Sequence, residues 1–571
     1  MTFKKLRPVI GLLAVVAFAG AGLLVFSEKN DPGFDTTLGP DNEACTVIMV
    51  GKAASTDGST MTTHTADCGT CDWTFGHFPA ADHKPGSTRK IYHISQYKTW
   101  KEATKWPYAM SQGETGFSIP QVPHTYAFHH GMFGYMNENQ VAISESTLGT
   151  VRKLVNNTPS AKLDLTMLSL LGMERSRTAR ECIEIMGSLA EKYGYGFNDD
   201  GEMFAVSDPD EVWIFEIMPV GPLWSPETGK PGAVWCAQRL PDDHVSVCPN
   251  ESRIGEVNLE DKENFMGSAH MVSFAVAQKL YDPASGKPFN WKRAYSPAEG
   301  SAVSTNGRRS RLWRFLDLVA PSLKLDPNTP NMDLPFSVKP DHKLSVQDVM
   351  NLTRDKSYGS IFDPVAGIRG GPFKNPHYYA ATRKISVANV EYTSLVQCRS
   401  GFPSAIGGIL WVAFGAQDTS CYIPLYAGMT ALPKSFLVGD HFVFNRSSAR
   451  WAFDYVDFHT QVVYNRAIQD VEKVRLEHEG AAIQAVPEID RKAMELYAKS
   501  PAKAAAYLTK TCVDQADRIV AAWWDLGDKL LVKYNHIGLY DAEKRIRDRS
   551  VPLYDEVWQK AVKMVDTWME K

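Results

Sequence analysis

Cys45 has the position and the chemistry of a nucleophile that carries its own base. It follows a leader with the features of a removable segment, and it begins the β-forming run from Cys45 to Gly51. If the bond between Ala44 and Cys45 is cut, the thiol and a free α-amino group belong to one residue. A thiol of pKa about 8.5 is only slightly ionised at neutral pH, and an α-amine of pKa about 8 can accept its proton. A buried apolar cysteine, or half of a disulfide, is the alternative that position alone leaves open.

A β-hairpin should bring polar side chains to this cysteine. The Asp-Gly pair at 57–58 predicts a turn, and the segment 59–65 is rich in β-forming residues. His64 and Asp67 lie at the end of that return segment, so pairing of the two segments places them near Cys45.

The larger elements that position this hairpin are predicted from pattern. Strand pairs are expected within 131–146, 203–217, 233–247 and 387–414, and helices at 160–171, 179–193, 309–319 and 346–355. Hairpins with helices on their faces indicate an α+β layered fold. From residue 447 the chain is charged and helix-forming, with helices expected at 450–474, 491–499, 502–533 and 542–569. We therefore expect a body at 45–446 and a helical C-terminal region at 447–571.

The first 26 residues have the pattern of a secretory signal or an N-terminal membrane anchor. Basic residues precede an apolar run at 9–26 that is long enough to be retained as a tether, although export with removal is favoured. Residues 27–44 contain few apolar side chains and several Pro and Gly, which indicates a linker and, after cleavage, a propeptide. The protein is therefore expected to be exported, to the periplasm or the exterior, with a possible membrane tether through 9–26.

Composition argues against a nucleic-acid partner. The 571 residues carry a formal net charge of -4, and 44% are hydrophobic while 22% are charged, so the chain is globular without a basic excess. Besides Cys45 there are eight cysteines, an even number that suits an oxidising compartment: 68, 71, 182, 236, 248, 398, 421 and 512. Cys68 and Cys71 form one Cys-x-x-Cys, and without a second such pair a zinc site is disfavoured. No metal or cofactor is called for.

Several segments in order resemble the dipeptidase A family of cysteine-type N-terminal nucleophile (Ntn) hydrolases, which is related to penicillin V acylase and bile salt hydrolase. The matching stretches are Cys45 to Met61, Gly134 to Glu138, Ala237 to His244, Asn250 to Ile254, Asp348 to Arg354, Ser420 to Gly428 and Arg450 to Phe453. The resemblance implies a four-layer αββα sandwich with Cys45 exposed by removal of the leader. Self-cleavage is one route to that removal.

The resemblance also implies partners for Cys45. Asp67 would orient the α-ammonium and thiol, although it could simply cap a turn. Asn250 would help to hold the oxyanion, with a loop turn as the alternative. Arg311 would keep the sulfur thiolate-like, but Arg308, Arg309 or a solvated helix start fit the register as well.

One position departs from the family. Many members have Arg-Asn-Glu-Asp where this chain has His64-Thr-Ala-Asp67. His64 could donate to a substrate carboxylate or tune the thiol, with less fixed charge than an arginine. For the adjacent Cys68 and Cys71, a short disulfide that stiffens the site wall is favoured over free thiols.

The expected activity is hydrolysis of dipeptides or other small peptides through a thioester on Cys45. An amide acylase of the penicillin V or bile salt type is the alternative within enzymes, since only the pocket separates the two. An inactive exported binding or scaffold protein on the same fold is the alternative outside them. The oligomeric state stays open, a homo-oligomer included.

Overall fold

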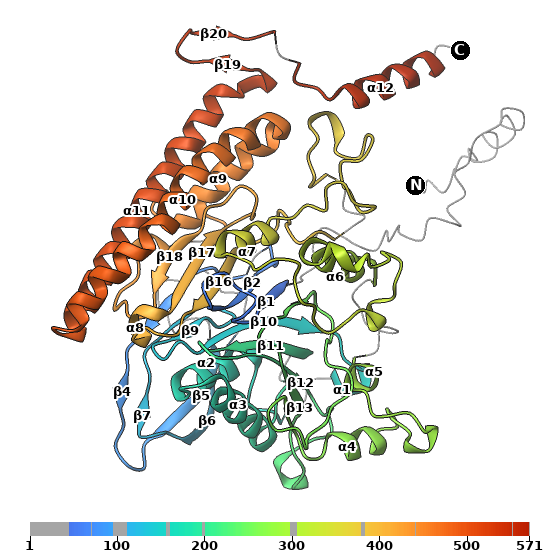
Figure 1. The fold of residues 1–571 in the computed structure, drawn as a ribbon, viewed down its shortest axis with the longest axis vertical. Coiled ribbons are helices and arrows are strands. Elements are labelled where there is room, and N and C mark those ends of the chain that lie inside the picture. The colour runs from blue at the N-terminus through green and yellow to red at the C-terminus, as the bar shows by residue number, and fades with distance from the viewer. Residues whose placement is uncertain are drawn as a thin grey trace, which may run out of the picture.

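Two antiparallel sheets form the centre of the protein in a computed structural model (Figure 1). The structure describes residues 45–69, 71–94, 111–155, 160–196, 200–296, 305–378, 383–439, 441–550 and 552–569. The predicted signal or anchor at 1–26 and the linker at 27–44 lie outside these residues.

The first sheet contains Cys45's strand near one edge. Its order is β14 (Val245–Cys248), β1 (Val47–Val50), β2 (Thr60–Thr65), β16 (Tyr392–Cys398), β17 (Ile409–Phe414) and β18 (Ile423–Tyr426). All five pairings are antiparallel. The predicted hairpins β1–β2 and β16–β17 are confirmed.

The second sheet is built mainly from successive hairpins. Its order is β15 (Phe265–Gly267), β13 (Val234–Arg239), β12 (Val212–Met218), β11 (Gly201–Ser207), β10 (Ala142–Leu148), β9 (Met136–Asn137), β8 (Phe128–His130) and β3 (Gly76–Phe78). Small ladders join β5 (Thr88–Ile94) to β6 (Ser111–Pro120) and β4 (Ala81–Asp82) to β7 (His124–Thr125). The predicted pairs β9–β10 and β11–β12 are confirmed.

The two sheets face each other, with β2 lying against β10 and β11. Successive side chains of a strand point to opposite faces. In β1, Val47 and Met49 belong to one buried apolar cluster, together with Met203 and Ala205 of β11, and the intervening Ile48 belongs to another. The strand that follows Cys45 is therefore fixed on both of its faces.

Helices cover the outer sides of the sheets. On the second sheet lie α2 (Leu165–Arg175) and α3 (Ala179–Tyr193), whose N-termini are capped by Asp164 and Thr178. The helix predicted at 179–193 is α3, and its buried Ile183 and Met186 recur at helical spacing. Around the first sheet lie α6 (Thr305–Val319), α7 (Val346–Thr353), α9 (Ala449–Val462), α10 (Tyr464–Tyr497) and α11 (Pro501–Lys533). The mixed α+β class is confirmed.

Two arginine–carboxylate pairs dock α10 onto the body, and we call them the helix seam. Arg354 binds Glu479 through both guanidinium nitrogens at 2.9 and 2.6 Å. Arg399 binds Asp490 in the same way at 2.6 and 3.0 Å. Figure 1 shows α10 and α11 lying beside β18, while α9 contacts β17. Trp523 of α11 is fully buried.

Three sequence expectations are corrected. β13 and β14, predicted as a hairpin, lie in different sheets, because β14 pairs with β1 and the turn at 241–243 carries the chain across. The stretch from 542 begins with the small hairpin β19 (Tyr540–Asp541) and β20 (Ile546–Arg547), and α12 (Glu556–Met569) starts later. Of the eight cysteines other than Cys45, whose even number suited disulfide pairing, only Cys68 and Cys71 form a disulfide. The other six are buried free thiols.

The remaining short helices are α1 (Arg152–Val155), α4 (Met271–Ala277), α5 (Trp291–Tyr295) and α8 (Ser404–Gly407). Among the described residues, no helix combines the length and the apolar character needed to cross a bilayer.

Candidate active site

Cys45 lies two residues before β1, where the hairpin to β2 is held by side chains. The hydroxyl of Thr65 accepts a hydrogen bond from the Thr46 N–H, and that of Thr63 accepts from the Ile48 N–H, both at 2.9 Å. At the open end of the hairpin, these hydroxyls accept the backbone N–H bonds that carbonyl oxygens accept in a regular β-ladder. The cysteine itself is 8% exposed, so its sulfur is nearly enclosed.

Arg311, on α6, connects Cys45 to Asn250. One guanidinium nitrogen donates to the carbonyl oxygen of Cys45 at 2.6 Å, and the other donates to the side-chain oxygen of Asn250 at 3.1 Å. Arg311 is 1% exposed, and the side chains of Arg308 and Arg309 lie outside the described part of the chain. The guanidinium therefore positions the backbone of the cysteine; these bonds do not reach its sulfur.

Asn250 follows β14 in a left-handed backbone conformation, with φ of 62°. Its amide nitrogen donates to the Thr147 carbonyl at 3.0 Å while its oxygen accepts from Arg311. These two bonds fix which end of the amide is the donor. One of the two amide hydrogens is used by Thr147, so a second is available to an oxyanion.

Asp67 lies just beyond β2, fully buried, and forms an ion pair with Arg383. Burial raises the pKa of Asp67 to about 6, while Arg383 and Arg311 oppose that rise. Sequence reasoning missed Arg383, which lies 316 residues along the chain from Asp67 and has no local signal.

Glu145 of β10 is the second residue that sequence reasoning missed. The Cys45 thiol donates to its Oε1 at 3.5 Å, and the His64 Nδ1 bonds its backbone carbonyl at 2.8 Å. The His64 Nε2 lies 3.7 Å from the same carboxylate oxygen. Ser144, Glu145 and Ser146 are all buried, and this polar run inside a strand was the signal available.

The site keeps the thiol protonated. Burial raises the pKa of Cys45 well above its usual value, and the negative charges of Glu145, Asp67 and Glu202 add to that rise. The backbone N–H of Asp67 acts in the opposite direction. Burial also lowers the pKa of His64, so its imidazole is neutral. A nucleophilic Cys45 therefore needs a base to remove its proton.

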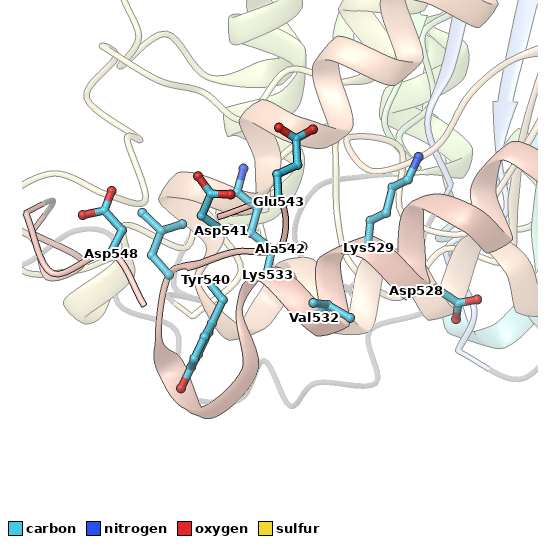
Figure 2. Close-up of a pocket in the computed structure, with 10 residues that line it drawn as sticks. Asp528, Lys529, Val532, Lys533, Tyr540, Asp541, Ala542, Glu543 and Asp548 are labelled. Carbon is cyan, nitrogen blue, oxygen red and sulfur yellow. The ribbon is translucent and has the colours of Figure 1, made fainter. Parts of the chain in front are cut away.

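The favoured disulfide between Cys68 and Cys71 is present, directly after Asp67. A separate hollow of about 660 Å³ lies at the end of α11, beside the β19–β20 hairpin (Figure 2). Acidic residues such as Asp541, Glu543 and Asp548 line it. None of the residues around Cys45 is part of that lining.

Taken together, the residues support acyl-transfer chemistry. They provide a thiol at a strand start, an amide donor held in a fixed direction, and buried charges around both. For a thiol to attack a carbonyl, a base must take its proton and a donor must stabilise the oxyanion. Asn250 can be the donor.

Comparison with known proteins identifies a matching family and several similar proteins. Peptidase family C69 matches residues 44–477. A probable dipeptidase of Salmonella dublin is 28% identical over 392 residues, 68% of this chain and 81% of that protein. One from Latilactobacillus sakei is 27% identical over 400 residues (69% and 76%), and probable dipeptidase A of Streptococcus pyogenes serotype M3 is 25% identical over 405 residues (69% and 78%). The family match includes Cys45 and every residue described around it.

Proposed function

Since this chain belongs to peptidase family C69, we propose that it hydrolyses dipeptides through a thioester on Cys45. The relatives named above as probable dipeptidases support this substrate class. The observation that carries the proposal is the bridge by which Arg311 holds both the Cys45 backbone and the Asn250 amide.

Activation begins with cleavage of the bond between Ala44 and Cys45. In the full-length chain the Cys45 nitrogen is part of a peptide bond and cannot act as a base. After cleavage, the free α-amine takes the thiol proton as the sulfur attacks the substrate carbonyl. Asp67, held by Arg383, orients the resulting ammonium group.

The remaining steps return the enzyme to its starting state. The second amide hydrogen of Asn250 stabilises the oxyanion, and the α-ammonium gives its proton to the leaving amine as the peptide bond breaks. Water then attacks the thioester, which releases the acid and restores the thiol.

The same proposal covers the whole chain. The stacked sheets with helices on their outer sides form an αββα Ntn-hydrolase sandwich, bounded near residue 446. Residues 1–26 direct export and 27–44 form the propeptide. Support for this comes from the order of layers and from the basic, then apolar, N-terminus.

A substrate panel with mature protein tests the activity. Wild type should hydrolyse dipeptides, and Cys45→Ala should not; turnover of penicillin V without any dipeptide activity would instead assign the acylase reaction. N-terminal sequencing of the exported protein should begin at Cys45. A mature chain that begins upstream would leave the proposed base amidated and would exclude the mechanism.

A further inference from the structure

Cys45, His64 and Glu145 bring three different metal-binding groups to one point. The sulfur, an imidazole nitrogen and a carboxylate oxygen all lie within 4.8 Å of one another, and all three residues are buried. They come from just before β1, from β2 and from β10, the facing strand of the other sheet. Thiolate, imidazole and carboxylate are the three protein ligand types of zinc.

The orientation of His64 is that of a ligand. Its Nδ1 lies 2.8 Å from the Glu145 carbonyl, an acceptor, so Nδ1 carries the proton and Nε2 has a lone pair. Nε2 and the Glu145 Oε2 are buried without a hydrogen-bond partner among the described residues. A metal-bound histidine is normally fixed in this way by its other nitrogen. Two unsatisfied acceptors beside a thiol favour a cation.

Two of the three spacings fit zinc, and the third, between the Cys45 Sγ and the His64 Nε2, is within 4.8 Å. With zinc bonds of about 2.0 to 2.3 Å, tetrahedral geometry separates sulfur from oxygen by about 3.5 Å and nitrogen from oxygen by about 3.3 Å. The corresponding distances are 3.5 Å from the Cys45 Sγ to the Glu145 Oε1 and 3.7 Å from the His64 Nε2 to the same oxygen. Only shifts of a few tenths of an ångström are required for these two pairs.

We propose that Cys45, His64 and Glu145 form a binding site for Zn²⁺, and that zinc bound there reversibly blocks the Cys45 thiol. On binding, the thiol proton leaves to solvent and zinc bonds the sulfur, the His64 Nε2 and a Glu145 oxygen, with water as the fourth ligand. One thiolate and one carboxylate neutralise the two positive charges, so the buried complex has no net charge. A soft thiolate and an imidazole select zinc over Mg²⁺ or Ca²⁺, which prefer oxygen ligands.

Zinc binding itself does not depend on the proposed function, but the inhibition does, because it requires Cys45 to be the nucleophile. Binding and activity are therefore measured separately. In the metal-freed mature protein, competition with a chromophoric chelator should show one Zn²⁺ bound per chain. Co²⁺ in its place should give a thiolate-to-cobalt charge-transfer band that is absent in Cys45→Ala. No such band in the wild type would overturn the proposal, and this measurement needs no variant of His64.

Variants then identify the other two ligands. His64→Gln and Glu145→Gln should each weaken zinc binding by at least about 100-fold. His124→Gln, a half-exposed histidine on β7 outside this cluster, is the matched control and should bind as the wild type does. Unchanged affinity in both ligand variants would overturn the assignment.

The activity measurement separates the two proposals. Zinc should inhibit dipeptide hydrolysis at the concentration that fills the site, and chelator should restore it. If zinc binds with the cobalt band but turnover continues, the metal site stands and Cys45 is not the nucleophile. If zinc inhibits equally in wild type and His64→Gln, the inhibition does not come from this site and the proposal fails.

Discussion

Buried charge is arranged differently at the helix seam and around Cys45. At the seam, Glu479 accepts two bonds from Arg354 and further bonds from the Tyr422 N–H and the Gln347 amide. At the site, Glu145 faces a thiol and a neutral imidazole, and one of its oxygens has no hydrogen-bond partner among the described residues. Both carboxylates are 1% exposed.

The two arrangements serve different ends. A buried charge stabilises a fold only when its partners satisfy it fully, and breaking such a pair is costly. The seam meets that condition and fixes α10. The site leaves acceptors unsatisfied beside a protonated thiol, which costs stability but leaves groups available for proton transfer or a cation.

The largest expected effect is on activity at the site. Cys45→Ala should reduce dipeptide turnover by about 10⁵-fold or more, because the attacking sulfur is removed. Its free energy of unfolding should stay close to that of the wild type, as measured by urea denaturation. Retained turnover would remove Cys45 from the mechanism.

At the helix seam we expect a large effect on stability and little effect on activity. Glu479→Gln should lower the free energy of unfolding by about 3 to 5 kcal/mol, because Arg354 would be left buried without its counter-charge. The turnover number of the folded fraction should change little. Glu488→Gln, on the same helix but in an exposed pair with Arg491, is the control and should leave stability unchanged. Equal losses in both variants would mean that the seam is no stronger than a surface pair.

Removing the oxyanion donor should give a smaller effect on activity. Asn250→Gly keeps the left-handed backbone and should reduce kcat by about 10² to 10³-fold, with a smaller change in KM. Lys279→Gly, at another left-handed position, is the control. An unchanged kcat would make Asn250 only a loop residue.

Acid should weaken the sheets that carry the site before it affects the seam. Burial lowers the pKa of His130, on β8, to about 3, below the value of about 6.5 in an unfolded chain. Its contribution to stability is complete above pH 6.5 and is lost as the pH falls from there toward 3. The loss should reach about 2 kcal/mol at about pH 5. Arg354 lowers the pKa of Glu479 against the effect of burial, so Glu479 keeps its charge through this pH range.

Hydrogen exchange across this pH range tests the order. Protection should fall first in β8 to β10 and later in α10. In His130→Gln, the loss of stability at about pH 5 should be smaller by about 2 kcal/mol than in the wild type. Simultaneous loss in both regions would show that they unfold as one unit.

Local pattern was enough for the hairpin that holds Cys45. The turn at 57–58 and the β-forming run after it predicted that His64 and Asp67 return to the cysteine, and the backbone N–H of Asp67 does act to lower the pKa of the Cys45 thiol. The same logic failed for β13 and β14, because a turn motif specifies a change of direction and not the strand that becomes the partner.

Patterns along the chain were enough to identify the nucleophile candidate, its hairpin, the helix-rich C-terminal region and, through matching segments, the family. Three contacts are visible only in the folded protein: Glu145 faces Cys45, Arg383 pairs with Asp67, and Arg311 donates to the backbone carbonyl of Cys45. These contacts join segments separated by 100 to 316 residues. Such contacts depend on the stacking of two sheets and the docking of α6. Short-range spacing carries no information about either, because stacking is set by burial of whole strand and helix faces.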